Sequence, residues 1–571
     1  MSNQPAPDQP APDQPASDQL GSDRSDPRPD AQADAAPAEP AAQPAGHPPL
    51  PFRWAVAYML AAAVIALSQG LQQGFVVTNL GPLAGDLGVT TASSAWLYIA
   101  YTIPRAALPV LLIKVRTQYG LRRFAELGIV VYVIVAFASV WITDFRSALV
   151  VQVLSGAAAA PLSTLGFLYM LEALSPEWKM RLGLPMALTV LLGGTTIARV
   201  VSPVLIGDGG FFWVHLTGLG LAMVSLMLVF FLPLRPIPRM KVIERMDFLS
   251  FGLITIGFGG LIAAFVMGPI YFWTDLAWIG WMLILGFTAL VLGVITELNR
   301  KAPLLDIRWL ASPAILHLTA TLFLFRLILS EQAAGAPKMF AVLGVAPDQM
   351  TTLFAIIFLA SLMGGLACVA WMRPTRVPWF HLIALLIIAF ASWLDSQSST
   401  LTRPMQMIVS QALVSFASML FIPPAMLSGL LIALAKGPQY LLSFVIIFIS
   451  SQTLGGVLGS GLFSTFTTHR QAFHMQSLTE QLTASDPQTM QAIAGGAASL
   501  AGQISDAGAR VAQATSQVVQ AASAEAWVRA YDDAYLLTAF VALIAAAMLL
   551  LHLLRDLMAR RAQTDIPGAK S

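Results

Sequence analysis

Long apolar stretches constrain this chain more than any other feature. Fourteen segments of roughly 20 mostly apolar residues follow one another, and that is the length an α-helix needs to cross a bilayer. The segments cover approximately residues 54–76, 93–113, 125–143, 147–172, 182–207, 211–234, 248–268, 277–297, 312–331, 349–372, 378–395, 405–435, 440–466 and 532–554. The short alternating segments of a membrane β-barrel do not occur. The sequence therefore predicts an all-α membrane protein with fourteen transmembrane helices.

Composition excludes the main soluble alternatives. Only 11% of the 571 residues are charged, whereas a soluble domain is about a quarter charged. The 32 Lys and Arg nearly balance the 30 Asp and Glu, which does not suit a nucleic-acid partner. The single cysteine, Cys368, lies in an apolar run and is expected to be a buried, inert thiol. No phosphate-binding loop, zinc motif or nucleophile motif is present, so we expect no enzyme activity, cofactor or metal site.

The ends and loops predict an orientation. Residues 1–52 begin with a repeated Pro-Ala-Asp unit from Gln4 to Asp18, and this composition predicts a disordered tail. Most Lys and Arg fall in the loops on the side of the N-terminus, so both termini are expected to be cytoplasmic. The composition and the loop plan hint at the inner membrane of a Gram-negative bacterium.

The longest outward segment spans residues 467–530. Its apolar positions step by four and three, which predicts a helical seam of about four heptads. The seam comprises Ile493, Ala497, Leu500, Ile504, Ala507, Val511, Ala514, Val518 and Ala521. Two interpretations stay open: the segment folds back on the rim of the protein, or it docks a partner outside the membrane.

Several local strings, taken in order, resemble a known family. Ser202-Pro203 through Gly207 resembles the antiporter motif GPxxGG, and Gln452 through Gly455-Gly456 is similar to RQxGGxxG. The string Ala530 to Tyr535 resembles AYNDAFW, and Glu297 with Pro303 to Arg308 resembles E…PLLDLR. In this order, over residues 50–560, the strings resemble the fourteen-span EmrB/QacA type of drug/proton antiporter in the major facilitator superfamily.

The resemblance implies a fold and partners. It implies two six-helix bundles, over 53–234 and 312–554, with two inserted helices and a linker over 235–311 and a cytoplasmic tail over 555–571. Such a transporter would bind an amphipathic small molecule near the bilayer midplane and exchange it for protons. Segment 467–530 would contact a periplasmic adaptor that leads to an outer-membrane channel.

The chain also departs from the family pattern. Gln72 stands where the first span of the family carries an Asp, and Gln152 lies where the fourth span carries an Arg. The loop motif between spans two and three keeps Gly120, Arg122 and Arg123 but has Thr117 in place of its Asp. Together with Ser202, Pro203, Gly207, Gly455 and Gly456, these three loop residues are the expected conformational motif residues.

Proton coupling requires a titratable group within the membrane. No Asp or Glu is expected near the middle of a span, because Glu126, Glu172, Glu297 and Glu331 fall at span ends. His317 is the single His well inside a span, although a packing role is the favoured interpretation of it. Glu331 is the most interesting acid, because Arg326 lies on the same helix.

Three arginines lie inside the spans: Arg105, Arg199 and Arg326. An arginine in hydrocarbon costs about 2.5 kcal/mol or more, so each should face a cavity or a partner. With few buried acids, they favour an anion-attracting cavity and an amphipathic organic acid as substrate. The sequence therefore predicts a secondary exporter of drugs or organic acids, with coupling residues among Arg105, Arg199, Arg326, His317, Glu331, Gln72 and Gln152. A membrane scaffold or sensor that has lost transport is the alternative.

Overall fold

The structure is a computed structural model that describes residues 50–564, apart from 208–209, 237–238 and 483–485. Most of the tail expected to be disordered, and the last seven residues, lie outside the described residues. Within that described part, every regular element is a helix. Fourteen helical segments there are long and apolar enough to cross a membrane, which confirms the prediction from the apolar stretches.

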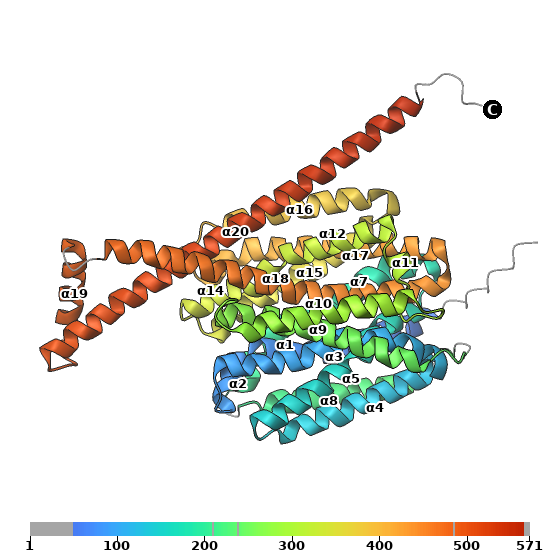
Figure 1. The fold of residues 1–571 in the computed structure, drawn as a ribbon, viewed down its shortest axis with the longest axis horizontal. Coiled ribbons are helices and arrows are strands. Elements are labelled where there is room, and N and C mark those ends of the chain that lie inside the picture. The colour runs from blue at the N-terminus through green and yellow to red at the C-terminus, as the bar shows by residue number, and fades with distance from the viewer. Residues whose placement is uncertain (1–49, 208–209, 237–238, 483–485, 565–571) are drawn as a thin grey trace, which may run out of the picture. The chain divides into compact units, whose positions relative to one another are not determined.

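The first six spans alternate in direction through short connections (Figure 1). They are α1 (Phe52–Thr78), α3 (Thr91–Tyr119), α4 (Leu121–Ala138), α5 (Phe145–Glu172), α7 (Leu184–Ile206) and α8 (Phe212–Phe231). Short helices lie between them: α2 (Leu80–Asp86), η1 (Ser139–Trp141), α6 (Pro176–Trp178) and the π-helix η2 (Lys179–Gly183).

The remaining spans form the inserted pair and the second bundle. The inserted pair is α9 (Arg245–Tyr271) and α10 (Ala277–Leu298). The second bundle contains α12 (Pro313–Ile328), α13 (Ser330–Ala334), α14 (Ala336–Val342), α15 (Thr351–Trp371), α16 (Val377–Asp395), α17 (Ile408–Lys436), α18 (Pro438–Gln481) and α20 (Ala507–Thr564). The shorter elements are α11 (Ile307–Leu310), η3 (Pro347–Met350), η4 (Pro374–Arg376), η5 (Pro404–Met407) and α19 (Pro487–Ser499).

Glycines set the closest helix contacts in the first bundle. A Cβ on Gly156 of α5 would lie 2.0 Å from the carbonyl oxygen of Tyr101 on α3. A Cβ on Gly70 of α1 would lie 2.9 Å from the Cα of Gly194 on α7. Backbones at this separation leave no room for any side chain, and small residues are the usual means of close packing between membrane helices. These contacts fix how α1, α3, α5 and α7 pack together.

A buried ion network joins the inserted pair to the first bundle. Asp247 of α9 is fully buried and accepts hydrogen bonds from Lys114 Nζ of α3 at 2.7 Å and from Arg300 Nη2 at 2.5 Å. Arg300 also donates to Glu297 and Glu244. Burial alone would lower the pKa of Arg300, but these carboxylate partners raise it above its ordinary value. The network links α9 and the end of α10 to α3, because Asp247 is the carboxylate that pairs with both Lys114 and Arg300.

The ninth span is broken into three helices and is longer than expected. It runs through α12, α13 and α14, with breaks at Leu329 and Gly335, so the candidate span extends to Val342 rather than ending near 331. The expectation that Glu331 lies at a span end is therefore wrong, because Glu331 lies within the span and is fully buried. Lys338 lies within the same span, on α14. Gly335, between α13 and α14, is the position where helical periodicity fails.

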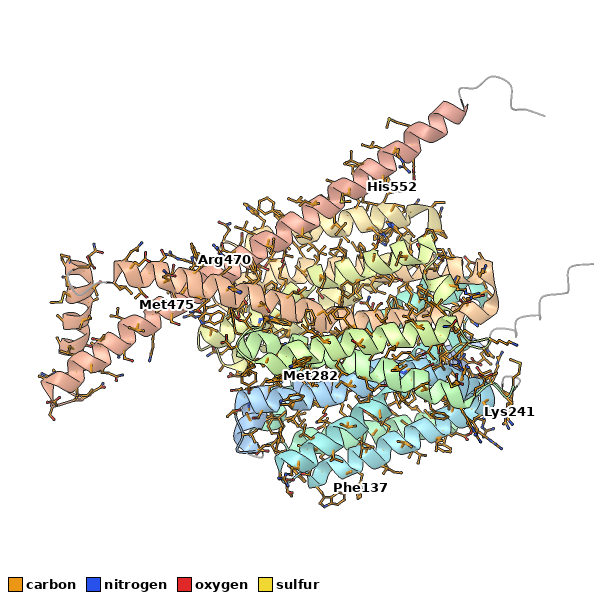
Figure 2. The ribbon with its side chains drawn as sticks, in the orientation of Figure 1. Phe137, Lys241, Met282, Arg470, Met475 and His552 are labelled. Atoms are coloured by element: carbon orange, nitrogen blue, oxygen red, sulfur yellow. The ribbon has the colours of Figure 1, made fainter. Side chains whose placement is uncertain are left out.

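Two helices are far longer than a membrane requires. At about 1.5 Å per residue, α18 with 44 residues and α20 with 58 residues exceed the bilayer thickness, so part of each lies outside it. The two helices pack along each other (Figure 1). Arg470 of α18 (Figure 2) donates to Asp533 of α20 at 2.6 Å, and His474 also contacts that carboxylate.

The predicted four-heptad seam of 493–521 is interrupted. Helix α19 ends at Ser499, and Asp506 starts α20 by accepting a hydrogen bond from the backbone of Ala509 at 2.6 Å. The chain therefore reverses, and α19 packs against α20, with Gly496 of α19 facing Ala514 of α20. The segment therefore folds on its own helices. The seam breaks because a Gly-containing turn and the N-cap of α20 separate its two halves. An adaptor contact through 467–530 stays a prediction.

Candidate functional site

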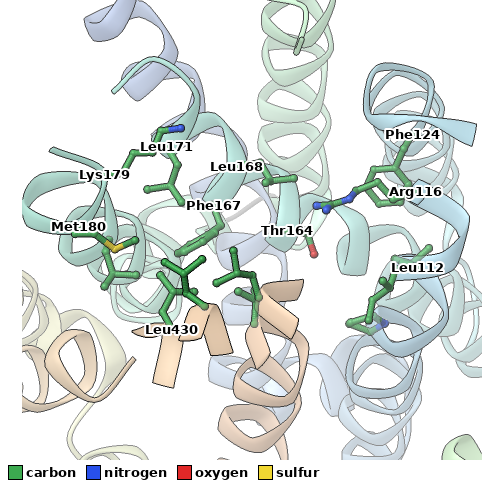
Figure 3. A pocket seen from close by; sticks show the side chains of 16 residues that line it. Leu112, Arg116, Phe124, Thr164, Phe167, Leu168, Leu171, Lys179, Met180 and Leu430 are labelled. Atoms are coloured by element: carbon green, nitrogen blue, oxygen red, sulfur yellow. The ribbon is translucent and has the colours of Figure 1, made fainter. Parts of the chain in front are cut away.

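A cavity of about 250 Å³ opens between the two bundles, at the end where α5 finishes and η2 begins (Figure 3). Leu430 and Leu434 of α17 face Leu112 of α3 and Phe167 of α5 across it. The lining is almost entirely apolar. Its polar groups include Arg116, Lys179 and Thr164. An apolar space with cationic groups at its edge suits a molecule that has an apolar body and a negative group.

The opposite end of the interface between the bundles is closed. Val200 of α7 packs against a buried cluster of the second bundle that includes Met339, Phe340, Leu353 and Phe354. Helices α3 and α18 also meet halfway, where Ser450 Oγ donates to the carbonyl of Ala106 at 3.1 Å. The interface between the bundles therefore has one open and one closed end in this structure.

Arg105 lies one helical turn deeper than the cavity-lining Pro109, on the same face of α3. Its Nη2 donates to Gln69 Oε1 at 3.1 Å, and the same oxygen accepts a bond from Ser163 Oγ. Its guanidinium also lies 5.9 Å from the Tyr101 ring centroid. Arg105 is thus oriented by neutral groups of the first bundle and keeps its positive charge uncompensated.

Arg326 lies on α12, in the second bundle. Its Nε donates to the carbonyl of Gln452 on α18 at 3.2 Å. A Cβ on Gly455 would lie 3.0 Å from Arg326 Cγ, and one on Gly456 would lie 3.2 Å from Nη2. The sequence suggested Arg326 and the pair Gly455-Gly456 for separate roles. In the structure they lie together, because the glycine pair lets the arginine lie along α18. Tyr98 of α3 is within electrostatic reach of both Arg326 and Arg105.

Arg199 and Lys338 form a second pair of cations, nearer the closed end. The Arg199 guanidinium lies 4.9 Å from the centroid of Phe354 on α15 and donates no hydrogen bond to the described residues. Lys338 Nζ donates to Ser464 Oγ of α18 at 2.8 Å and is close enough to Arg199 for their charges to interact. Sequence reasoning missed Lys338, although the apolar run that continues to Val342 could have placed it inside the span.

None of these four cations has an ion pair among the residues that the structure describes. Two come from each bundle: Arg105 and Arg199 from the first, Arg326 and Lys338 from the second. Their positive charge therefore faces the interface between the bundles without compensation, which is a field that attracts anions.

The other candidate substrate and coupling residues lie in two different environments. Gln72 Nε2 donates to Ser155 Oγ at 3.4 Å, and the amide oxygens of Gln72 and Gln152 are buried without a partner in the described structure. These two glutamines form a neutral polar patch between α1 and α5. His317 is exposed on α12, so the structure does not place it in a buried polar cluster.

The motif residues have local roles. Ser202 is buried and accepts a hydrogen bond from Asn79 Nδ2 at 2.6 Å, and this bond connects α7 to the end of α1. Pro203 lies within α7, and Gly207 follows the last residue of that helix. Gly120 has φ +85°, a conformation that favours glycine, and it turns the chain between α3 and α4. Arg122 pairs only with Glu126 one turn away, and Arg123 is exposed. In this loop region, Lys114 is the residue that makes the long-range ion pair.

A cluster of buried carboxyl groups lies in the second bundle. Glu331 of α13 accepts a hydrogen bond from Ser392 Oγ of α16, and its charge interacts with that of Asp395, one turn further along α16. Asp395 is 2% exposed and accepts from Gln411 Nε2 at 2.7 Å. Sequence reasoning missed Asp395, because it is the last residue of its span and looked like an interfacial charge.

Comparisons with known proteins agree with this architecture. No family model matches the sequence, and no curated protein matches it. Among solved structures, the human organic anion transporter MFSD10 (TETRAN) has 13% identity and a TM-score of 0.51, and the match covers 86% of this chain and 99% of that one. The proton:xylose symporter XylE of E. coli has 12% identity and a TM-score of 0.49, and the match covers 86% and 95%.

The fold is the major facilitator fold, with two six-helix bundles and two inserted helices. The chain is a multi-pass membrane protein with fourteen candidate spans among its described residues. Membership of the EmrB/QacA family stays a resemblance.

Proposed function

We propose that the protein is a secondary transporter that exports amphipathic organic anions across a bacterial inner membrane by alternating access, driven by protons. One observation carries the choice of an anion: four cations of the bundle interface have no ion pair among the described residues. Cations kept at such cost are expected to serve a ligand of opposite charge. A cationic drug, the other substrate class that the resemblance implies, would be repelled.

The cavity supports the amphipathic part of the proposal. Its walls are apolar, so they favour an aromatic or aliphatic body. Arg116 and Lys179 at the cavity and Arg105 one turn deeper would attract a carboxylate along its path. With both termini in the cytoplasm, as the charge distribution predicts, the open end faces the cytoplasm, from which an exporter loads. The structurally similar human protein MFSD10 is an organic anion transporter, which is consistent with this choice.

Arg199 provides the test. We expect Arg199→Gln to leave folding intact, because Arg199 donates no hydrogen bond to the described residues. The loss of one charge-assisted contact with the anion, about 1.5 kcal/mol or more, would lower transport about tenfold or more. The measurement is uptake of a labelled aromatic carboxylate into inside-out vesicles, at matched membrane levels of protein.

The matched control is Arg146→Gln, which removes an exposed arginine from the first turn of α5. It should transport like the unsubstituted protein. Equal transport by Arg199→Gln would contradict a role for this cation. If the unsubstituted protein moves no carboxylate, the anion proposal fails and the scaffold alternative gains support.

A further inference from the structure

We propose that the carboxyl pair Glu331–Asp395 is the proton-binding site that couples transport. Movement of the broken ninth span would link the charge of this pair to the position of the cations at the bundle interface. This inference rests on the proposed function, and it names the site at which the driving ion binds.

The geometry of the pair suits one shared proton. Glu331 is fully buried and Asp395 nearly so. Ser392, which donates to Glu331, lies one turn before Asp395 on α16, so the two carboxyl groups are close enough for their charges to interact. Two buried carboxylates so close together cannot both be ionised, because their repulsion is not screened. They hold one proton between them, as coupled pairs do. A carboxyl O–H bond forms when a proton is taken from water on one side and breaks when the proton is released on the other side.

The surroundings of the pair leave a place for a proton and provide no counter-charge. Tyr535 of α20 is fully buried, its hydroxyl has no hydrogen-bond partner in the described structure, and it is in electrostatic contact with both carboxyl groups. One oxygen of Glu331 and one of Asp532 are likewise buried without such a partner. These unpartnered groups converge where a bound proton would complete the hydrogen bonds.

The titratable groups around the pair are all acids or tyrosines. Asp395 faces Glu331 from α16, and Tyr531, Asp532 and Tyr535 approach from α20. The helices α17 and α16 contribute neutral donors, Gln411 and Ser392. The cations of the same broken span bond elsewhere, Arg326 to a carbonyl and Lys338 to Ser464. No Lys or Arg in the described part of the chain therefore forms an ion pair with the two carboxyl groups.

A route to water exists on one side. Asp532 is half-buried and lies close to the backbone of Ser398, in the loop that follows α16. It therefore lies between this surface loop and the buried pair. This loop is at the closed end of the bundle interface, which the predicted orientation places outside the cell. Protons would thus enter from the acidic side.

The broken span links the pair to the proposed substrate site. Glu331 lies five residues after Arg326 and seven before Lys338, on the segment made of α12, α13 and α14. Gly335 separates α13 from α14, and a Cβ there would lie 2.8 Å from Tyr535 Cε1. Since half-helices joined by a break can shift separately, a change in the charge of Glu331 would move both cations.

The test separates coupling from transport. In proteoliposomes that contain Glu331→Gln, we expect carboxylate accumulation driven by a pH gradient to fall about tenfold or more, while exchange of labelled for unlabelled carboxylate stays within about twofold. Glu331→Asp, which keeps the acid, should recover part of the accumulation. Asp348→Asn removes an exposed acid and serves as the matched control. Accumulation that is unchanged in Glu331→Gln would overturn the inference.

A second measurement does not depend on transport. Infrared difference spectra of the purified protein should show a protonated carboxyl band that is absent from Glu331→Gln, because Asp395 then has no acidic partner to share a proton with. Persistence of this band would also contradict the inference. A sodium gradient that drives accumulation in place of a pH gradient would show that the site takes a metal cation instead. Failure of the unsubstituted protein to exchange any carboxylate would count against the proposed function alone.

Discussion

At the scale of single residues, the sequence located the charges but not their partners. Arg105, Arg199 and Arg326 were expected to face a cavity or a partner, and each lies at the bundle interface with no ion pair among the described residues. Glu331 and Asp395 were misjudged or missed, because residues at the end of an apolar run look interfacial whether they are exposed or buried. Only the packing of α16, α17 and α20 around them decides this, and hydropathy does not record packing between helices.

The ion network of Asp247 leads to a prediction about stability. Asp247→Asn would remove the carboxylate that compensates Lys114 and Arg300, and breaking such a buried pair costs about 3–5 kcal/mol. We expect a clearly lower unfolding temperature in detergent. The control is Glu126→Gln, which breaks the exposed pair with Arg122 and should cost about 0.5 kcal/mol or less. Equal unfolding temperatures for the two variants would refute the proposed role of the network.

At the scale of elements, the fourteen spans could be predicted, because length and hydropathy determine them. The break of the ninth span at Gly335 and the reversal after α19 could not be read from apolar periodicity alone. Gly335 is also required by its contact with Tyr535, which lies 200 residues further along the chain. Contacts of this kind depend on tertiary structure.

Helix packing leads to a prediction about glycine. Gly156→Ala would place a Cβ 2.0 Å from the Tyr101 carbonyl oxygen, so α3 and α5 would have to separate. Overpacking typically costs about 1–3 kcal/mol, and we expect a lower unfolding temperature and less folded protein in the membrane. Gly218→Ala, in α8, meets no atom within 4 Å and should be neutral. A neutral Gly156→Ala would show that the helices are less tightly packed than described.

At the scale of the whole molecule, one end of the bundle interface is open and the other is closed. Apolar side chains of α7 and of the second bundle close one end, and the cavity between α3, α5 and α17 opens the other. An asymmetry of this kind is expected of one state of the proposed alternating mechanism. The sequence indicated such a mechanism only by resemblance, because the state that a chain adopts depends on small differences in packing energy between two arrangements.

The open state leads to a prediction about accessibility. The single native cysteine, Cys368, is buried, so a cysteine placed in the cavity can be labelled selectively. We expect Leu434→Cys, at an exposed position of the cavity lining, to react with a water-soluble thiol reagent in inside-out vesicles and to react more slowly when a pH gradient drives the cycle. Reaction only from the opposite side of the membrane would show that the predicted orientation is reversed.

Proton-coupled export of organic anions is the central claim, and it has a direct test. Inside-out vesicles that contain the protein would be energised to become acidic inside, with a fluorescent dye that is quenched by acid. We expect aromatic carboxylates to restore the fluorescence and lipophilic cations to leave it quenched, and Glu331→Gln should abolish the response. A response to the cations alone, or no response while labelled carboxylate still crosses the membrane, would contradict the account.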